Sequence, residues 1–264
     1  MHDSANTLDA LRRRIARIDG RGKDSPVPGF GFGEMAHLPG LLARGAMHEI
    51  VAADAAHAAA ATGFAAMLAV RALLPARPLL WLRTERAERR SGALYAPGLA
   101  DLGLDPDALL IGVFADDLAL LRAAADASRC SALSVLVVEC WGNPRTLDLT
   151  ATRRLASAAA QAGVAILLLR LSAEPMPSAA DTRWQITSAP SAALPARAPG
   201  HPVLGLELLR RKAGPSGQSW MIEWRRDERG FHAGTSAPLS GAVLPPAAVR
   251  AAAPFPARRL AANA

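Results

Sequence analysis

The sequence contains very little lysine and very little cysteine. Of its 30 basic residues two are lysines, Lys23 and Lys212, and the others are arginines. The two cysteines, Cys130 and Cys140, fit a cytosolic protein whose thiols stay reduced. Cys140 lies in an apolar segment, which favours a small core residue over a nucleophile.

Long apolar runs and a leader segment are also missing. The most apolar run near the start, residues 55–74, is rich in alanine and is interrupted by His57, Thr62 and Arg71. We therefore expect no membrane-spanning helix. Because the N-terminus lacks a charged-then-apolar leader, we expect no signal peptide and a cytoplasmic protein.

No pattern for metal binding or covalent catalysis is present. The six histidines show no pair four residues apart and no companion cysteines, so we expect no zinc site. No Gly-x-Ser-x-Gly motif occurs, and no segment that resembles the end of a strand places a serine beside a base. The sequence therefore predicts no catalytic residues of these kinds and no bound metal.

The scarcity of lysine also bears on nucleotide binding. The segment "AMHEIV" (46–51) has the pattern of a buried strand, and it runs directly into the alanine-rich helix predicted over 55–74. A phosphate-binding loop at such a turn needs glycines for close backbone approach and a lysine beside the phosphates. Alanines fill most of positions 52–61, and neither lysine lies near them. We therefore predict a degenerate phosphate loop and no bound cofactor.

Short apolar segments alternate with helical segments through the middle of the chain. The predicted strands are 46–51, 78–83, 109–113, 133–140 and 164–171, and the predicted crossover helices are 55–74, 115–128 and 147–161. Nearly continuous apolar strands are typical of a parallel sheet that is buried on both faces. The pattern predicts an α/β fold, with a mostly parallel twisted sheet flanked by helices.

The last third of the core has a different pattern. Segments 183–188, 205–212 and 219–226 have the alternation of half-buried strands separated by turns, which predicts late antiparallel strands. We expect three parts: an N-terminal amphipathic helix and linker over 1–33, a core domain over 34–235, and a tail rich in proline, alanine and arginine over 236–264.

Two segments are candidates for binding a partner. Residues 5–18 place leucine and isoleucine on one helical face. From residue 190 onward the sequence has ten basic and four acidic residues, and this excess makes up most of the net charge of +7. The alternatives are a helix packed on its own domain, a solvated arginine surface and a tail without a role. The candidate partner-binding residues are Leu8, Leu11, Ile15, Arg250, Phe255, Arg258 and Arg259.

Four motifs occur in the order found in RecA-like recombinases. They are "GAMHEIV", "PLLWLRTE", "LYAPGLADLGLDPDALLIGV" and "ALSVLVVECWG". Because of the order and spacing of these motifs, the chain resembles the RecA-like recombinases over residues 35–230. Among them it is most similar to the ImuA proteins of the bacterial SOS mutagenesis cassette. The resemblance places Glu85 at the position of the glutamate that activates water in RecA, and Glu139 at the position of the Walker B aspartate.

The departures from the family point toward a lost nucleotide site. Arg170 and Leu171 stand where RecA has a polar pair that senses nucleotide and contacts DNA. The alternative for Glu85 and Glu139 is that they are exposed or salt-bridged carboxylates at strand ends, without a catalytic role. The resemblance to ImuA then implies a non-catalytic accessory protein of error-prone translesion DNA synthesis. Its implied partners are the Y-family-like protein ImuB, an error-prone homologue of the replicative polymerase α-subunit and RecA itself, with any contact to DNA indirect.

Two other functions remain open from the sequence. A DNA-dependent ATPase with an atypical phosphate site would need Arg44 or Arg71 in place of the lysine. A cell-division inhibitor similar to SulA would share a degenerate RecA-like fold and would bind the division protein FtsZ.

Overall fold

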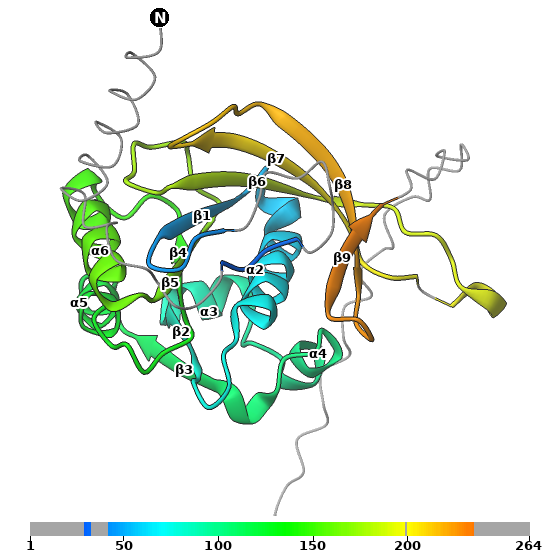
Figure 1. The fold of residues 1–264 in the computed structure, drawn as a ribbon, viewed down its shortest axis with the longest axis horizontal. Helices are drawn as coiled ribbons and strands as arrows, with labels where there is room; N and C mark the ends of the chain where they lie inside the picture. The colour runs from blue at the N-terminus through cyan, green and yellow to red at the C-terminus, as the bar shows by residue number, and fades with distance from the viewer. Residues whose placement is uncertain (1–28, 33–41, 199, 235–264) are drawn as a thin grey trace, which may run out of the picture.

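One large sheet forms the centre of the protein. The computed structural model describes residues 29–32, 42–198 and 200–234. Its nine strands lie in the order β3-β2-β4-β5-β1-β6-β7-β8-β9 (Figure 1). The sheet is mostly parallel in its first half and antiparallel in its second, so the predicted α/β class with late antiparallel strands is confirmed.

The parallel half contains every strand predicted for it. These strands are β1 (Met47–Ala52), β2 (Leu79–Thr84), β3 (Leu109–Phe114), β4 (Val135–Trp141) and β5 (Ala165–Leu171). Each pairs in parallel with its neighbours, and β6 (Thr182–Ala189) also runs parallel to β1. Almost every side chain of β4 and β5 is buried, as expected for strands covered on both faces.

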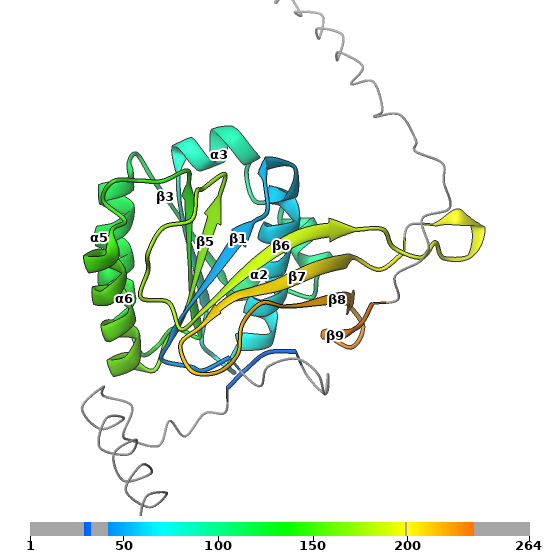
Figure 2. The same cartoon turned by 90° about the horizontal axis from the view of Figure 1, so that it is seen from above.

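The antiparallel half is a meander. From β6 the chain continues through β7 (Val203–Arg211), β8 (Gln218–Arg225) and the short β9 (Gly230–Ala233), each antiparallel to the one before. The connection between β6 and β7 includes a 3-10 turn, η3 (Pro195–Arg197), and projects from the body in Figure 2. We did not predict β9, which is only four residues long.

Helices cover the two faces of the parallel half in two groups. A 3-10 turn, η1 (Ala55–His57), leads into α2 (Ala58–Ala72), which shares one face with α3 (Glu85–Ser91) and α4 (Ala96–Asp101). The other face carries α5 (Asp117–Ala127) and α6 (Leu149–Ala162), as Figure 1 shows. Asp148 caps α6 by accepting from the backbone N–H of Ala151 at 2.7 Å. A third 3-10 turn, η2 (Pro106–Ala108), precedes β3.

Helix α2 is the central helix of the core. By length and composition alone Ala55–Ala72 could cross a membrane, but 56% of that window is buried inside the fold. Phe64, Leu68 and Ala69 are fully buried, and the helix packs on β1, β4, β5 and β6. Its apolar character is therefore explained by packing against the sheet.

The segment 29–32 joins this core. Phe30 and Phe32 are each 3% exposed, although they fall in the segment assigned to the linker. The Phe32 ring lies 5.2 Å from that of Trp184 and 5.4 Å from that of Phe231, between centroids. An aromatic cluster thus ties the N-terminal side of the core to the last strand.

Candidate functional site at the carboxyl ends of the parallel strands

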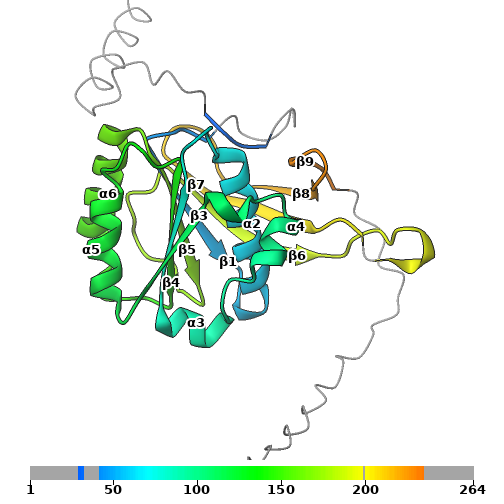
Figure 3. The ribbon, with the colours of Figure 1, turned by 90° about the horizontal axis from the view of Figure 1, so that it is seen from below.

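The carboxyl ends of the parallel strands meet at one edge of the sheet. In open α/β sheets ligands bind outside this edge, so it is the first place to look for a functional site. Helix α3 follows β2 directly and lies at this edge in Figure 3. The turn after β1 and the ends of β4 and β5 complete it.

The turn between β1 and α2 is short and already capped. Only Ala53 and Asp54 separate the end of β1 from η1. The Asp54 carboxylate accepts the backbone N–H groups of Ala56 at 2.8 Å and His57 at 3.2 Å. These are the donors that a phosphate would take at a helix N-terminus. A carboxylate in their place both occupies them and repels an anion.

His57 is fixed on the neighbouring strand. Its Nδ1 accepts the backbone N–H of Ser188 at 3.1 Å, and the Ser188 hydroxyl lies 3.0 Å from the same nitrogen. Because Nδ1 accepts, these contacts select the tautomer with the proton on Nε2. The turn is thereby held against β6.

The two arginines considered as lysine substitutes lie at the far end of α2. Arg44 donates to the carbonyl of Ala72 at 2.8 Å, and Arg71 donates to the carbonyl of Gly31 at 3.2 Å. Helix α2 has 15 residues and so is about 22 Å long. Neither guanidinium can reach a phosphate at the turn after β1, so the idea that one of them replaces the lysine is wrong.

Glu139 belongs to a buried ion pair on the α2 face. Its side chain is 1% exposed, and Oε1 accepts from Nη2 of Arg83 at 3.0 Å. The other oxygen, Oε2, accepts from Nε1 of Trp81 at 2.9 Å. Ser91 at the end of α3 accepts from the same Arg83 nitrogen at 2.8 Å, which ties α3 to the sheet. The Glu139 carboxylate therefore forms a structural salt bridge, which was one of the alternatives given for this residue.

Glu85 does not approach Glu139. It is the first residue of α3, is 55% exposed and pairs with Arg89 one turn later at 3.2 Å. The two carboxylates singled out in the sequence are thus not brought together as a hydrolytic site.

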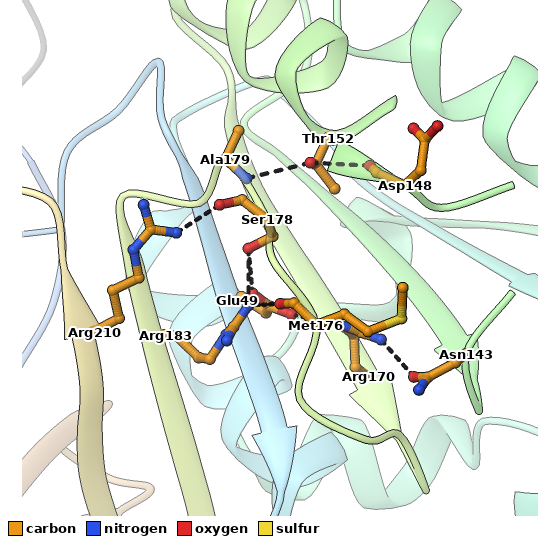
Figure 4. Close-up of polar contacts among 10 residues, drawn as sticks. All are labelled: Glu49, Asn143, Asp148, Thr152, Arg170, Met176, Ser178, Ala179, Arg183 and Arg210. Carbon is orange, nitrogen blue, oxygen red and sulfur yellow. Dashed lines mark hydrogen bonds and ion pairs between the residues drawn. The ribbon is translucent and has the colours of Figure 1, made fainter. Parts of the chain in front are cut away.

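A second buried cluster lies on the other face of the sheet, around Glu49 (Figure 4). Its carboxylate is fully buried and accepts from Arg170 Nη1 at 3.0 Å and from Arg183 Nε at 2.8 Å. The Ser178 hydroxyl donates to it at 2.6 Å. One buried carboxylate therefore serves two guanidinium groups, one from β5 and one from β6.

This cluster holds the segment between β5 and β6 in place. Arg183 donates to the carbonyl of Met176 and to the Ser178 hydroxyl, and Arg210 donates to the Ser178 carbonyl at 2.5 Å. Arg170 also donates to the Asn143 side chain after β4 at 2.6 Å. Arg170 is thus 3% exposed and ion-paired with Glu49.

Several buried nitrogen atoms in the two clusters lack a partner. Within the described ranges these are Nε and Nη1 of Arg83 and Nε of Arg170. Each belongs to a guanidinium that is nevertheless ion-paired through another nitrogen. Ordered water is the usual partner of such atoms.

Cys140 lies in β4 and packs in the hydrophobic core on the face covered by α5 and α6. It is 1% exposed, and burial raises the pKa of its thiol to about 12. The thiol therefore stays protonated at neutral pH and cannot act as a nucleophile. This agrees with the core role expected from the sequence.

The predicted partner-binding residues cannot be placed on this framework. The N-terminal set (Leu8, Leu11 and Ile15) and the C-terminal set (Arg250, Phe255, Arg258 and Arg259) lie outside the described residues. Among the residues that are described, no group of three or more His, Cys, Asp or Glu side chains is arranged to hold a metal ion.

The Glu49 cluster was missed although the sequence carries a signal for it. Glu49, Arg83 and Arg170, like Glu139, are charged residues inside otherwise apolar strands. A charge buried in a parallel strand needs a partner of opposite sign, so four such residues predict two pairs. Which residues pair depends on strand order, which the sequence pattern does not give.

Comparison with known proteins gives a likeness of fold. No family model matches the sequence, and a search of curated proteins finds no match. Among solved structures, the crystal structure of the RadB recombinase is similar to this chain. The identity is 15%, the match covers 73% of this chain and 92% of that chain, and the TM-score is 0.48. A likeness at this level concerns the fold alone.

Proposed function

We propose that this chain is a RecA-like protein without ATPase activity that acts as an accessory factor in SOS-induced, error-prone translesion DNA synthesis. The ordered motifs that resemble ImuA support the family assignment. The five strands predicted for the parallel half lie side by side in one parallel sheet, which agrees with the order of these motifs along the chain. The observation that carries the proposal is the capped turn after β1.

The turn argues against nucleotide binding in three ways. Two residues between strand and helix are too few for a loop that wraps a phosphate. The Asp54 carboxylate takes the helix N-terminal donors. No lysine lies between Lys23 and Lys212 to offset phosphate charge. Loss of any one feature would weaken binding, and all three are lost together.

The remaining positions of a hydrolytic site support the same interpretation. Each oxygen of the buried Glu139 carboxylate already accepts a hydrogen bond, Oε1 from Arg83 and Oε2 from Trp81. Arg170 is buried against Glu49 rather than directed at a ligand. The polar groups at this edge stabilise the scaffold instead of forming a reactive centre.

The role itself follows from the resemblance to ImuA. A scaffold that retains its sheet but not its nucleotide site can act by holding partners together. The proposed partners are an ImuB-like Y-family protein, an error-prone polymerase α-subunit homologue and RecA, in the cytoplasm. Contact with DNA would be indirect.

Thermal unfolding with and without nucleotide tests the absence of ATP binding. A ligand that binds only the native state must raise the melting temperature. We expect no change in Tm at saturating ATP and Mg²⁺, and no ATP hydrolysis with or without single-stranded DNA. A nucleotide-dependent rise of several degrees would overturn the proposal and favour an unusual ATPase.

Co-purification from DNA-damaged cells, followed by mass spectrometry, tests the role. Recovery of a Y-family-like protein and a polymerase α-subunit homologue is the expected result. Recovery of FtsZ in their place would support a cell-division inhibitor similar to SulA. A chain lacking residues 238–264 is expected to lose the partners, because that segment carries the basic candidate residues.

A further inference from the structure

A hollow of about 300 Å³ lies on the antiparallel meander, and its lining residues come from three adjacent strands, β6, β7 and β8. Gln185, Thr187 and Glu207 line it, and they alternate along their strands with the buried core residues Ile186 and Leu206. Because alternate residues of a strand face opposite ways, these three side chains lie on the face opposite to α2. Helices α5 and α6 pack on the parallel half, away from β7 and β8 (Figure 2). Within the described part of the chain, no helix covers the hollow.

Gly205 forms the floor of the hollow. It pairs with Thr187 on β6 and with Met221 on β8, so it lies in the middle of the three strands. A Cβ atom at this position would collide with the Thr187 hydroxyl oxygen, which donates to the Gly205 carbonyl at 3.4 Å. A glycine inside a strand often marks a place where another group approaches the sheet closely.

Three polar side chains form one wall of the hollow. Gln185 pairs with Glu207, and Glu207 pairs with Ser219, so an amide, a carboxylate and a hydroxyl lie in one row across the strands. Among the described residues none of these three side chains has a hydrogen bond or an ion pair. Glu207 is nevertheless half-buried, and a carboxylate that loses solvent requires a partner.

Glu207 differs in this respect from the other glutamates of the sheet. Glu49, Glu139 and Glu223 also lie in strands of the described core, and each pairs with an arginine of the chain. Glu207 alone among these four has no arginine beside it. The group that is missing at the hollow is therefore a guanidinium.

We propose that the hollow binds an arginine side chain of a partner protein. The planar guanidinium would donate two hydrogen bonds to the Glu207 carboxylate and others to the side-chain oxygens of Gln185 and Ser219. Met221 would supply apolar surface for the methylene groups of the arginine. This inference does not rest on the proposed role in translesion synthesis.

Size and charge favour a single side chain as the occupant. A volume of about 300 Å³ is at the lower limit of pockets that hold small-molecule ligands. The one carboxylate balances a single positive charge, whereas a divalent metal ion is held by several carboxylate and carbonyl oxygens. The hollow is open at the surface of the sheet, so an arginine that projects from a partner can enter it.

A blocked arginine tests the site directly. The probe is Nα-acetyl-arginine methylamide, added to the full chain at millimolar concentrations and followed by the NMR shifts of backbone amides. We expect saturable shifts at residues 185–187, 205–207 and 219–221. The citrulline compound has the same shape without the charge and should cause none, and the lysine compound should bind more weakly because it lacks the planar pair of donors. Absence of shifts with the arginine compound would overturn the proposal.

Substitutions locate the site. Glu207→Gln keeps the size of the side chain and removes its charge, so arginine binding should weaken by about tenfold or more, and Ser219→Ala should weaken it by roughly two- to tenfold. Glu174→Gln is the matched control, because Glu174 is exposed in the segment between β5 and β6, and it should leave binding unchanged. Unchanged melting temperatures show that each variant is folded. Equal binding by Glu207→Gln and the unaltered chain would overturn the proposal.

Further comparisons identify the source of the arginine. The peptide Gly-Ser-Arg-Ser-Gly should bind more tightly than the blocked amino acid, because a polypeptide also contacts the sheet around the hollow. Tighter binding of the blocked amino acid would indicate a free small molecule instead. Binding that appears only after residues 235–264 are removed would make the chain itself the occupant, and self-association lost in Glu207→Gln would indicate a second copy. Each of these three results would overturn the assignment to a partner protein.

Discussion

Buried charges within the strands form two structural ion-pair clusters, one on each face of the sheet. The Glu49 cluster joins β1, β5 and β6, and the pair between Arg83 and Glu139 joins β2 and β4. Buried ion pairs cost desolvation energy, so they contribute more to the specific arrangement of strands than to net stability. At the residue scale, these buried charges connect neighbouring strands of the sheet.

Replacing Glu49 with glutamine is expected to destabilise the fold strongly. The substitution keeps the size of the side chain but leaves Arg170 and Arg183 buried without their counter-charge. Removing one partner of a buried ion pair costs about 3–5 kcal/mol. Urea unfolding measures the change, with Glu85→Gln as control because its pair with Arg89 is exposed and should contribute about 0.5 kcal/mol or less. Similar unfolding midpoints for both variants would contradict this role.

His48 makes stability depend on pH. The ring is buried, its Nε2 donates to the Ala43 carbonyl at 3.0 Å, and Nδ1 accepts from the Thr182 hydroxyl at 3.0 Å. The hydroxyl oxygen of Thr182 in turn accepts from Trp184 Nε1 at 2.9 Å. This chain satisfies a neutral imidazole, and burial lowers the pKa of His48 in the folded protein.

The sign of the pH effect follows from this lowered pKa. Above the unfolded pKa of about 6.5 the imidazole is neutral in both states, and its full contribution to stability is present. As the pH falls below that value the unfolded state binds a proton that the folded state does not, so stability is lost by up to about 1.4 kcal/mol per pH unit. Urea unfolding at a series of pH values measures this loss. His48→Gln should be less stable at neutral pH but should lose less on acidification, and an unchanged pH dependence would exclude His48 as the source.

At the scale of elements, the short turn between β1 and α2 combines two properties. Asp54 begins η1 and thereby α2, and it also closes the helix N-terminus to anions. A cap of this kind stabilises a helix by about 1 kcal/mol. The same carboxylate therefore connects stability to the proposed loss of nucleotide binding.

Asp54→Ala is expected to lower the free energy of unfolding by about 1 kcal/mol, because two backbone donors lose their acceptor. ATP and Mg²⁺ should still leave the melting temperature unchanged, since the glycines and the lysine are missing as well. Asp107→Ala is a control aspartate whose change should be small. A rise in Tm with ATP in the Asp54→Ala variant would show that Asp54 alone blocks the site.

Elements whose burial follows a simple period were predictable from the sequence. The five strands β1 to β5 and the three long helices lie where apolar runs and helical spacing placed them. The short elements α3, α4 and β9 were not assigned. Thr84 and Arg83 fix α3 through a cap and a contact to Ser91, and such contacts depend on tertiary structure. Pairing of Glu49 with Arg170 joins positions 121 residues apart, which no local pattern specifies.

At the scale of the whole molecule, acidic and basic residues are separated along the chain. Residues 92–121, which include β3 at one end of the sheet, have five aspartates and no lysine or arginine, whereas the basic excess begins with the meander and continues into the C-terminal segment.

The N-terminal boundary of the core can be tested by comparing two changes. If the amphipathic helix predicted over residues 5–18 docks on a partner, deleting residues 1–28 should leave the melting temperature nearly unchanged. Phe32→Ala should instead cost about 3–5 kcal/mol, since the ring is buried against Phe64, Trp184 and Phe231. For a domain of this size that corresponds to a fall in Tm of roughly 6–20 °C. Calorimetry of both proteins measures the difference. A large fall on deletion would place the N-terminal helix in the chain's own core, and a small effect of Phe32→Ala would return residues 29–32 to the linker.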